Sequence, residues 1–242
     1  MKGRIDLRSD TVTKPSVAMR QAMSEAEVGD DVFKEDPTAN MLQEKAAKIL
    51  GKAAAVFVCS GTMANQLSIK AHTQAGDEII AELNSHVFNV EAAAPAALSG
   101  VQVFPIKSKR GIMNASQIEN AIRPIGDPHY AKTRLICLEN THNRGGGAVY
   151  PYENMIEIHQ LAKANDILIH IDGARIFNAS VATGINVKEY ARLCDSISFC
   201  LSKGLGCPVG SIIAGSKEFI LFVAPITITF PLDFNPSIMV KI

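Results

Sequence analysis

Residues 167–175 read Ile-Leu-Ile-His-Ile-Asp-Gly-Ala-Arg, a short apolar run that ends on an aspartate and a glycine. A run of this length beside turn residues is typical of a strand buried inside a sheet, here residues 167–171. Similar runs occur at residues 54–58, 78–82, 101–105, 134–138 and 195–200. The chain therefore contains a series of short buried strands.

Helical patterns lie between these runs, near residues 62–75, 114–123 and 152–165. Another helix precedes the first strand, with Pro37 in its first turn and Gly51 just past its end. Strands that alternate with helices predict βαβ units, and hence an α/β fold with a mostly parallel sheet covered on both faces. Such sheets bind ligands at the carboxyl ends of their strands.

The composition is that of an ordinary globular protein. Of 242 residues, 47% are hydrophobic and 20% charged, and 24 basic residues balance 24 acidic ones. A neutral chain of this kind argues against nucleic-acid and membrane-surface partners, which select a basic excess. The five cysteines are odd in number and none is spaced C-x-x-C, which favours free thiols in a reducing compartment. With neither a signal-peptide pattern nor a membrane-spanning run, the cytoplasm is the expected location.

The two ends of the sequence depart from the strand–helix alternation. Residues 1–35 are polar and acidic, with a short helical pattern near 15–26, and we expect an arm wrapped on a domain of residues 36–220. Residues 221–242 form an apolar tail, in which the run 226–230 is expected to be β-prone and to favour aggregation.

Residues with chemical potential follow the predicted strands directly. Ser60, Gly61 and Thr62 come after the first strand and open a helix, where free N–H groups can hold a phosphate. An ordinary helix cap by Ser60 would explain the same pattern. Asp172 ends the strand at 167–171 and can keep a ring nitrogen protonated, or it can cap the next helix. Arg175 can contact an anionic ligand or form a surface ion pair.

Two further positions complete a possible site. Ser202 and Lys203 follow the run at 195–200, and a partly buried lysine there can attack a carbonyl, although a solvated turn lysine is the simpler interpretation. His86 follows the run at 78–82 and can stack on a flat ring or move protons, or it can be structural. Because Asp172 and Lys203 are 31 residues apart, one helix and one strand fit between them, and both are expected at the same sheet edge.

These motifs belong to a larger resemblance. Residues 6–13, 27–31, 35–37, 60–62, 139–144, 170–178 and 201–204 resemble low-specificity L-threonine aldolases, and the similarity runs through residues 4–220. That family uses pyridoxal 5'-phosphate (PLP) and has the fold type I architecture. The resemblance implies retro-aldol cleavage of a β-hydroxy-α-amino acid such as L-threonine to glycine and acetaldehyde. It also implies homodimers or homotetramers, and no metal.

The resemblance assigns a role to each matching position. Lys203 would hold the cofactor covalently, Asp172 would pair with its ring nitrogen, and His86 would stack on the ring. The cofactor phosphate would lie on the segment of Ser60, Gly61 and Thr62, with Ser202 nearby. Substrate contacts would come from Arg175, which can also reach the cofactor's phenolic oxygen, and from Ser9 and His129. The catalytic base stays open between His86, His129 and a water molecule.

Family members extend beyond the last residue of this sequence. They carry a small C-terminal domain with an arginine for the substrate carboxylate, and residues 221–242 contain no arginine. The sequence is therefore expected to lack that domain. Two alternatives to the aldolase follow, a catalytically impaired fragment or isoform of the family and another fold type I lyase that performs β-elimination.

Overall fold

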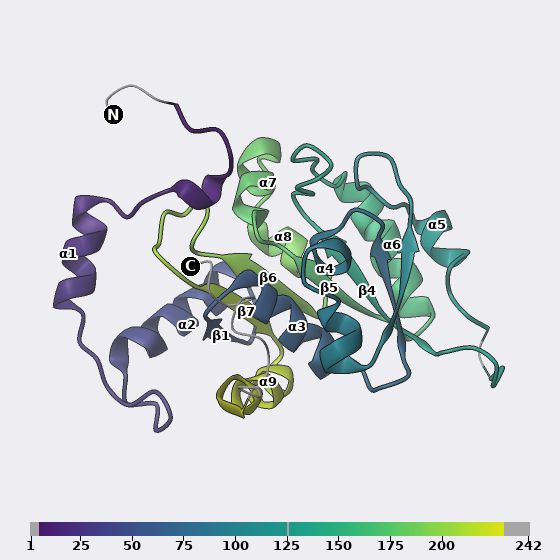
Figure 1. The fold of residues 1–242 in the computed structure, drawn as a ribbon, viewed down its shortest axis with the longest axis horizontal. Coiled ribbons are helices and arrows are strands. Elements are labelled where there is room, and N and C mark those ends of the chain that lie inside the picture. Colours follow the sequence, from purple (N-terminus) through teal and green to yellow (C-terminus); the bar gives the residue numbers. More distant parts are fainter. Residues whose placement is uncertain (1–4, 125, 230–242) are drawn as a thin grey trace.

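The structure is a computed structural model that describes residues 5–124 and 126–229, with the backbone alone for 226–229. A seven-stranded sheet crosses the molecule in the order β1-β7-β6-β5-β4-β2-β3 (Figure 1). The strands are β1 (Ala54–Val58), β2 (Glu78–Glu82), β3 (Gln102–Ile106), β4 (Thr133–Glu139), β5 (Leu168–Asp172), β6 (Ser196–Cys200) and β7 (Ser211–Gly215). Four of the six pairings are parallel, and β7 runs antiparallel to both of its neighbours.

The helices connect and cover these strands. They are η1 (Asp10–Val12), α1 (Val17–Glu25), α2 (Pro37–Leu50), α3 (Gly61–His72), α4 (His86–Asn89), η2 (Pro95–Ser99), α5 (Ala115–Glu119), α6 (Tyr152–Ala164), α7 (Ile176–Thr183), α8 (Val187–Ala191) and α9 (Lys217–Thr229). One core packs α2, α6, α7 and α8 against the sheet, and two smaller cores pack α3, α4 and α9 on the opposite face. The predicted α/β/α arrangement with a mostly parallel sheet is confirmed.

Local chemistry explains where α2 begins and ends. The Asp36 side chain accepts the N–H of Ala39, and Pro37 occupies the first turn, where its missing N–H costs nothing. Gly51 ends the helix with φ +65°, a left-handed conformation that side chains with a Cβ rarely adopt. All six predicted strands are present, each within one residue of its predicted bounds.

The structure corrects several expectations. Strand β7 was not predicted, because only four residues lie between Gly210 and Gly215, the last residue of the strand. The helix predicted at 114–123 ends at Glu119. The run 226–230 was expected to be β-prone, but its residues 226–229 belong to α9, and Phe230 lies outside the described residues. Helix α9 starts upstream with Ser216 accepting the N–H of Phe219, and Ile220 and Val223 pack against β1, so tertiary packing overrides the β-branched composition.

The N-terminal arm contacts the domain at η1 and then leaves it. The hydroxyl of Thr13 donates to the carbonyl oxygen of Lys203 at 2.6 Å. Helix α1, which lies entirely in the described part of the chain, contains no buried residue and stands apart at the left of Figure 1. The wrapped arm stays a prediction for α1, whose half-buried Met19 lies near Gly206. Within residues 5–124 and 126–229, no helix combines the length and apolarity that crossing a bilayer requires.

Candidate active site

The polar segments singled out by sequence meet at one edge of the sheet. Strands β5 and β6 are parallel neighbours in which Asp172 lies opposite Ser198, so Lys203 follows the next strand over. Strand β2 ends just before His86, and β1 ends just before Ser60. Because these strands share one direction, their carboxyl ends place the four segments together, as predicted from their spacing.

The start of α3 offers unused hydrogen-bond donors. The Ser60 hydroxyl accepts the N–H of Met63 at 3.1 Å, so the cap predicted as the simpler interpretation is present. Among the described residues, none accepts the N–H of Gly61 or Thr62, and both groups point along the positive end of a twelve-residue helix. A Cβ at position 61 would lie 2.8 Å from the Cys200 sulfur, so the close approach of α3 to β6 requires glycine there. This helix start can hold an anion.

Asp172 is buried and hydrogen-bonded through both oxygens. Its Oδ2 accepts the side-chain amide of Asn65 at 2.8 Å, and its Oδ1 accepts the N–H of Ala174 at 3.0 Å. Burial by itself would raise the pKa of this carboxyl. The nearby charges of His86 and Lys203, together with the two hydrogen bonds, outweigh burial and hold the pKa below its ordinary value. Asp172 is therefore an anion at neutral pH.

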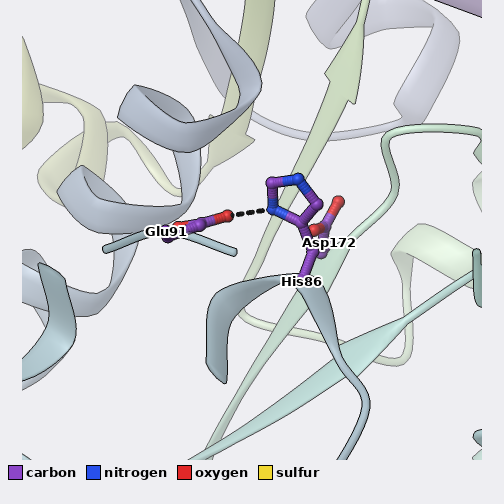
Figure 2. A group of neighbouring side chains, drawn as sticks. All are labelled: His86, Glu91 and Asp172. Atoms are coloured by element: carbon purple, nitrogen blue, oxygen red, sulfur yellow. Dashed lines mark hydrogen bonds and ion pairs between the residues drawn. The ribbon is translucent and has the colours of Figure 1, made fainter. Parts of the chain in front are cut away.

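His86 lies beside Asp172 and is fixed from two directions (Figure 2). Its ring Nδ1 is 2.6 Å from Oε1 of the fully buried Glu91, and its backbone N–H donates to Glu139 at 2.7 Å. Burial lowers the pKa of the imidazole, but the hydrogen bond and charge of Glu91, with the charge of Asp172, raise it above its ordinary value. The ring is about one-third exposed, so it remains accessible to a ligand.

Lys203 and Ser202 lie in the turn that joins β6 to β7. The N–H of Ser202 donates to the carbonyl oxygen of Gly210 at 3.3 Å, which closes the turn. Both side chains are partly buried. The Lys203 ammonium contributes to the electrostatics of Asp172 and of His86, so its amine belongs to the same group.

Arg175 is already paired. Its Nε and Nη2 donate to the two oxygens of Asp10 at 2.8 and 2.7 Å, a two-bond fork between the arm and the start of α7. The fork raises the pKa of the guanidinium and lowers that of the carboxyl. Ser9 begins η1, where its hydroxyl accepts the N–H of Thr11. The predicted substrate contacts Ser9 and Arg175 thus lie at one junction, and Asp10 between them was not singled out by sequence.

His129 is not brought to this group. It lies in the loop before β4, at the amino end of that strand, whereas Asp172 ends the neighbouring strand at the opposite edge. Its side chain is 87% exposed and its Nδ1 is 2.9 Å from Asp127. Within a single chain, the loop cannot contribute His129 to the site unless it moves across the sheet.

The glycine-rich loop at 139–147 contacts the backbone of His86 and so supports the site. His142 is fully buried, accepts the N–H of Gly145 at Nδ1, and directs Nε2 toward Glu82 at 3.2 Å. Glu139 accepts the N–H groups of Asn143 and His86, which ties this loop to the histidine. Burial raises the pKa of the Glu139 carboxyl. His142 therefore holds the loop together rather than facing a ligand.

Three atoms at this edge also have the spacing of a metal site. Ligand atoms of His86, Glu91 and Asp172 all lie within 4.8 Å of one another. The Glu91 oxygen concerned already faces the amide of Asn65 and the His86 ring, and the Asp172 oxygens receive two N–H groups. A cation there would have to displace these donors, so the donor set fits a protonated nitrogen better than a metal.

Sequence reasoning missed the buried polar residues that support the site. Asn65, Glu91 and His170 all lie within hydrogen-bond distance of the residues just described. A signal was available in the strands, because Ile169, Ile171, Ile197 and Phe199 join the core on one face while the residues between them are polar. Polar side chains that alternate with core residues in two neighbouring strands indicate a buried polar layer under α3.

The fold agrees with comparisons to known proteins. The sequence profile of the family described as beta-eliminating lyase matches residues 6–223, and the chain belongs to that family.

Curated relatives carry a narrower name. A probable low-specificity L-threonine aldolase 2 of Arabidopsis thaliana is 50% identical over 219 residues, which cover 89% of this chain and 62% of that protein. The low specificity L-threonine aldolase of Escherichia coli strain K12 is 46% identical over 217 residues, 89% of this chain and 64% of that protein. The chain thus spans less than two thirds of the length of these relatives. The resemblance that the motifs indicated is confirmed.

Solved structures show the same fold at low sequence identity. A threonine aldolase from Leishmania major superposes with a TM-score of 0.80 at 19% identity, over 92% of this chain and 65% of that one. A putative L-allo-threonine aldolase from Listeria monocytogenes gives 0.75 at 21% identity, over 94% and 64%. At such identities the likeness establishes the fold alone.

Proposed function

We propose that this chain belongs to a PLP-dependent aldolase that cleaves β-hydroxy-α-amino acids such as L-threonine to glycine and an aldehyde. One observation carries the proposal, namely that an ionised Asp172 lies beside His86 at the end of β5, with the amine of Lys203 one strand over. Relatives named as threonine aldolases and the family profile support it.

The side chains and backbone groups present fit the cofactor. The free N–H groups of Gly61 and Thr62 suit a phosphate, and Ser202 follows β6, which approaches Gly61 at Cys200. The buried anion Asp172 suits a protonated pyridine nitrogen, and Lys203 supplies an amine for the aldehyde. We infer that these residues hold PLP, with Ser60 fixing the helix start that carries the donors.

When bound, PLP supplies an electron-withdrawing ring that accepts the electrons released as a bond to the substrate α-carbon breaks. Asp172 keeps the ring nitrogen protonated, because its two hydrogen bonds and its cationic neighbours hold it as an anion. Burial strengthens this pairing, since the local dielectric is low. Asp172 is therefore the residue on which the chemistry depends most after Lys203.

His86 is the proposed proton carrier. Because its Nδ1 faces the buried carboxylate of Glu91 at 2.6 Å, that nitrogen keeps its proton. Nε2 is then the atom that can accept a proton from the substrate β-hydroxyl and return it. A water molecule held by His86 would serve the same step. A role for His129 stays a prediction, which requires that its loop moves or that His129 comes from a second chain.

Substrate binding is proposed at the junction of the arm and α7. Arg175 presents a guanidinium that suits the α-carboxylate, and Ser9 offers a hydroxyl next to Asp10, the residue that binds this guanidinium. Asp10 occupies the guanidinium when no substrate is present. A substrate carboxylate would therefore compete with Asp10 for Arg175, which couples binding to the position of the arm.

Assembly is proposed from the surface of the arm. Several of its large apolar side chains are exposed, and they include Ile5, Leu7, Val17, Val28 and Phe33. Exposed apolar side chains in such number mark an interface. We infer a homodimer or homotetramer in which the arm packs against a second copy, and we retain residues 1–35 as the arm, 36–220 as the cofactor-binding domain and 221–242 as the tail. The free thiols of all five cysteines support a cytoplasmic location.

The experiment is covalent trapping of the cofactor on the purified chain. PLP is added, the sample is reduced with sodium borohydride, and peptides are analysed by mass spectrometry, where the cofactor's mass on Lys203 is the expected result. Lys203→Ala should lose both this adduct and the visible absorption band, and Lys217→Ala, on the exposed start of α9, should keep them. A folded wild-type chain without any adduct would overturn the proposal.

Product identification separates the aldolase from its alternatives. With L-threonine or L-allo-threonine, glycine and acetaldehyde should form in equal amounts. The family description makes β-elimination the second candidate, and it would release ammonia and a keto acid instead. A chain that binds PLP on Lys203 but releases no product would be a catalytically impaired fragment.

A further inference from the structure

A buried amide joins the two carboxylates of the site. The Nδ2 of Asn65 donates to Oε1 of Glu91 and to Oδ2 of Asp172, both at 2.8 Å. Its Oδ1 lies 3.2 Å from Nε2 of His170 and 3.2 Å from the hydroxyl of Ser198. The side chain is buried, and all four of its hydrogen-bonding positions are used.

These contacts fix the direction of every bond around Asn65. Ionised carboxylates only accept hydrogen bonds, so both must face the amide nitrogen of Asn65 and not its oxygen. The oxygen then faces His170, and because it can only accept, Nε2 of His170 must carry a proton. Through Asn65, the two carboxylates thus determine which ring nitrogen of His170 carries the proton.

The hydrogen-bond chain continues from His170 through Ser196 to His72. Nδ1 of His170 lies 2.8 Å from the hydroxyl of Ser196, and Nε2 of His72 lies 2.8 Å from that hydroxyl on the other side. Burial lowers the pKa of His72 to about 4 and that of His170 to about 3, so both rings are neutral at pH 7. A neutral His170 with a proton on Nε2 accepts from Ser196 at Nδ1, and Ser196 in turn accepts from His72. All donors in this chain point toward Asp172.

We propose that Asn65 is a positioning residue which, held by His170, orients Asp172 toward the ring nitrogen of the cofactor and Glu91 toward His86. This inference rests on the proposed function for the cofactor, but the hydrogen-bond chain itself does not. The amide of Asn65 orients both carboxylates at once, since Glu91 binds the ring of His86 through the same oxygen that Asn65 contacts. Because Asn65 donates to Oδ2 and Ala174 donates to Oδ1, rotation of the Asp172 carboxylate would break both hydrogen bonds.

The first test uses the chain without cofactor. Nitrogen-15 NMR of histidine-labelled protein reports which ring nitrogen carries the proton, and the expected result for His170 at pH 7 is a protonated Nε2 with an unprotonated Nδ1. Asn65→Leu should remove that preference, because the acceptor for Nε2 is lost. Gln66→Leu is the matched control, since Gln66 is the next buried residue of α3 and donates to Glu91 alone. A proton on Nδ1 of His170 in the wild type would overturn the inference.

The second test uses conservative substitutions of His170 and measures cofactor affinity by absorbance titration. Gln places an amide nitrogen where Nε2 lies and can donate to Asn65, whereas Asn reaches only the position of Nδ1. His170→Gln should therefore stay near the wild-type dissociation constant, and His170→Asn should weaken binding by roughly 10-fold, the upper value for one hydrogen bond between neutral groups. Asn65→Leu should lose roughly 10- to 100-fold on the same basis.

The outcomes separate this inference from the proposed function. If Gln and Asn at position 170 weaken binding equally while the folded state is retained, His170 is merely structural and the inference fails. If the wild type shows the expected tautomer but binds no cofactor, the proposed function fails and the hydrogen-bond chain stands. Should Asn65→Leu not fold, the pair of His170 variants and the wild-type NMR spectrum still decide the question.

Discussion

The carboxyl edge of the sheet and the N-terminal arm reverse the usual distribution of side chains. At the sheet edge, polar and charged groups such as Asn65 of α3, Glu91 and Asp172 are buried. In the arm, large apolar groups such as Leu7 and Phe33 are exposed. Both regions depart from the rule that apolar residues are inside and charged ones outside.

The difference lies in where each region finds its partners. At the sheet edge, the buried Asn65 finds its partners within one chain, because it connects Asp172 with Glu91 and His170. The arm is held by the fork between Asp10 and Arg175 and then leaves the domain. A single chain thus preorganises the groups proposed to do the chemistry, whereas the exposed apolar side chains of the arm are the basis of the proposed assembly.

The largest effect is expected at the sheet edge from Asp172→Asn. The substitution removes a buried anion and puts an amide N–H₂ in reach of the donors from Asn65 and Ala174. Removing one partner of a buried charge pair costs roughly 3–5 kcal/mol, so aldol cleavage should fall at least about 100-fold. Steady-state kinetics measure it, with Asp166→Asn as the control, because Asp166 is 93% exposed. Equal activity of the two variants would remove Asp172 from the mechanism.

His72, at the outer end of the hydrogen-bond chain, should affect how the free energy of unfolding depends on acid pH. The pKa of His72 is lowered to about 4, so its contribution to stability is present above the unfolded value near 6.5 and is lost as the pH falls toward 4. The free energy of unfolding should fall by about 1.4 kcal/mol per pH unit from this group within that window. Urea unfolding of His72→Gln should show a shallower fall than the wild type. Parallel curves would show that His72 does not stay neutral.

The junction between the two regions should respond to Asp10→Asn. Loss of the partly buried fork to Arg175 should lower the free energy of local opening of η1 by about 1–2 kcal/mol. This corresponds to a roughly 5- to 30-fold faster exchange of its amide hydrogens. Hydrogen exchange over residues 10–13 measures this. Asp6→Asn is the matched control, because its pair with Arg8 is exposed and should leave those amides unchanged.

The smallest effect on a single chain is expected in the arm. Phe33→Ser should change the free energy of unfolding of the dilute monomer by about 0.5 kcal/mol or less, since the side chain is 75% exposed. Leu67→Ala, in the core under α3, should cost about 2–5 kcal/mol. Sedimentation should show that Phe33→Ser weakens assembly. A large loss of monomer stability would instead mean that the arm packs on its own chain.

Prediction from sequence succeeded where a local pattern has one structural solution. The apolar run at 78–82 became a strand with the expected bounds, because a run buried on both faces fits the interior of a parallel sheet. The order of site residues followed from the same pattern, since each chemical group comes directly after a strand. The prediction for residues 226–229 was wrong, because their composition favours strands while the helix that begins at Lys217 continues through them.

The sequence by itself determined six of the seven strands, the family, and the edge at which Ser60, His86, Asp172 and Lys203 gather. Only the tertiary structure decided what holds them, namely that Asn65 spans Asp172 and Glu91, that Asp10 takes Arg175, and that His129 stays at the far edge. The physical reason is that strand positions follow from local hydrophobicity. A hydrogen bond between residues 107 apart, as between Asn65 and Asp172, depends instead on how α3 is packed over the sheet.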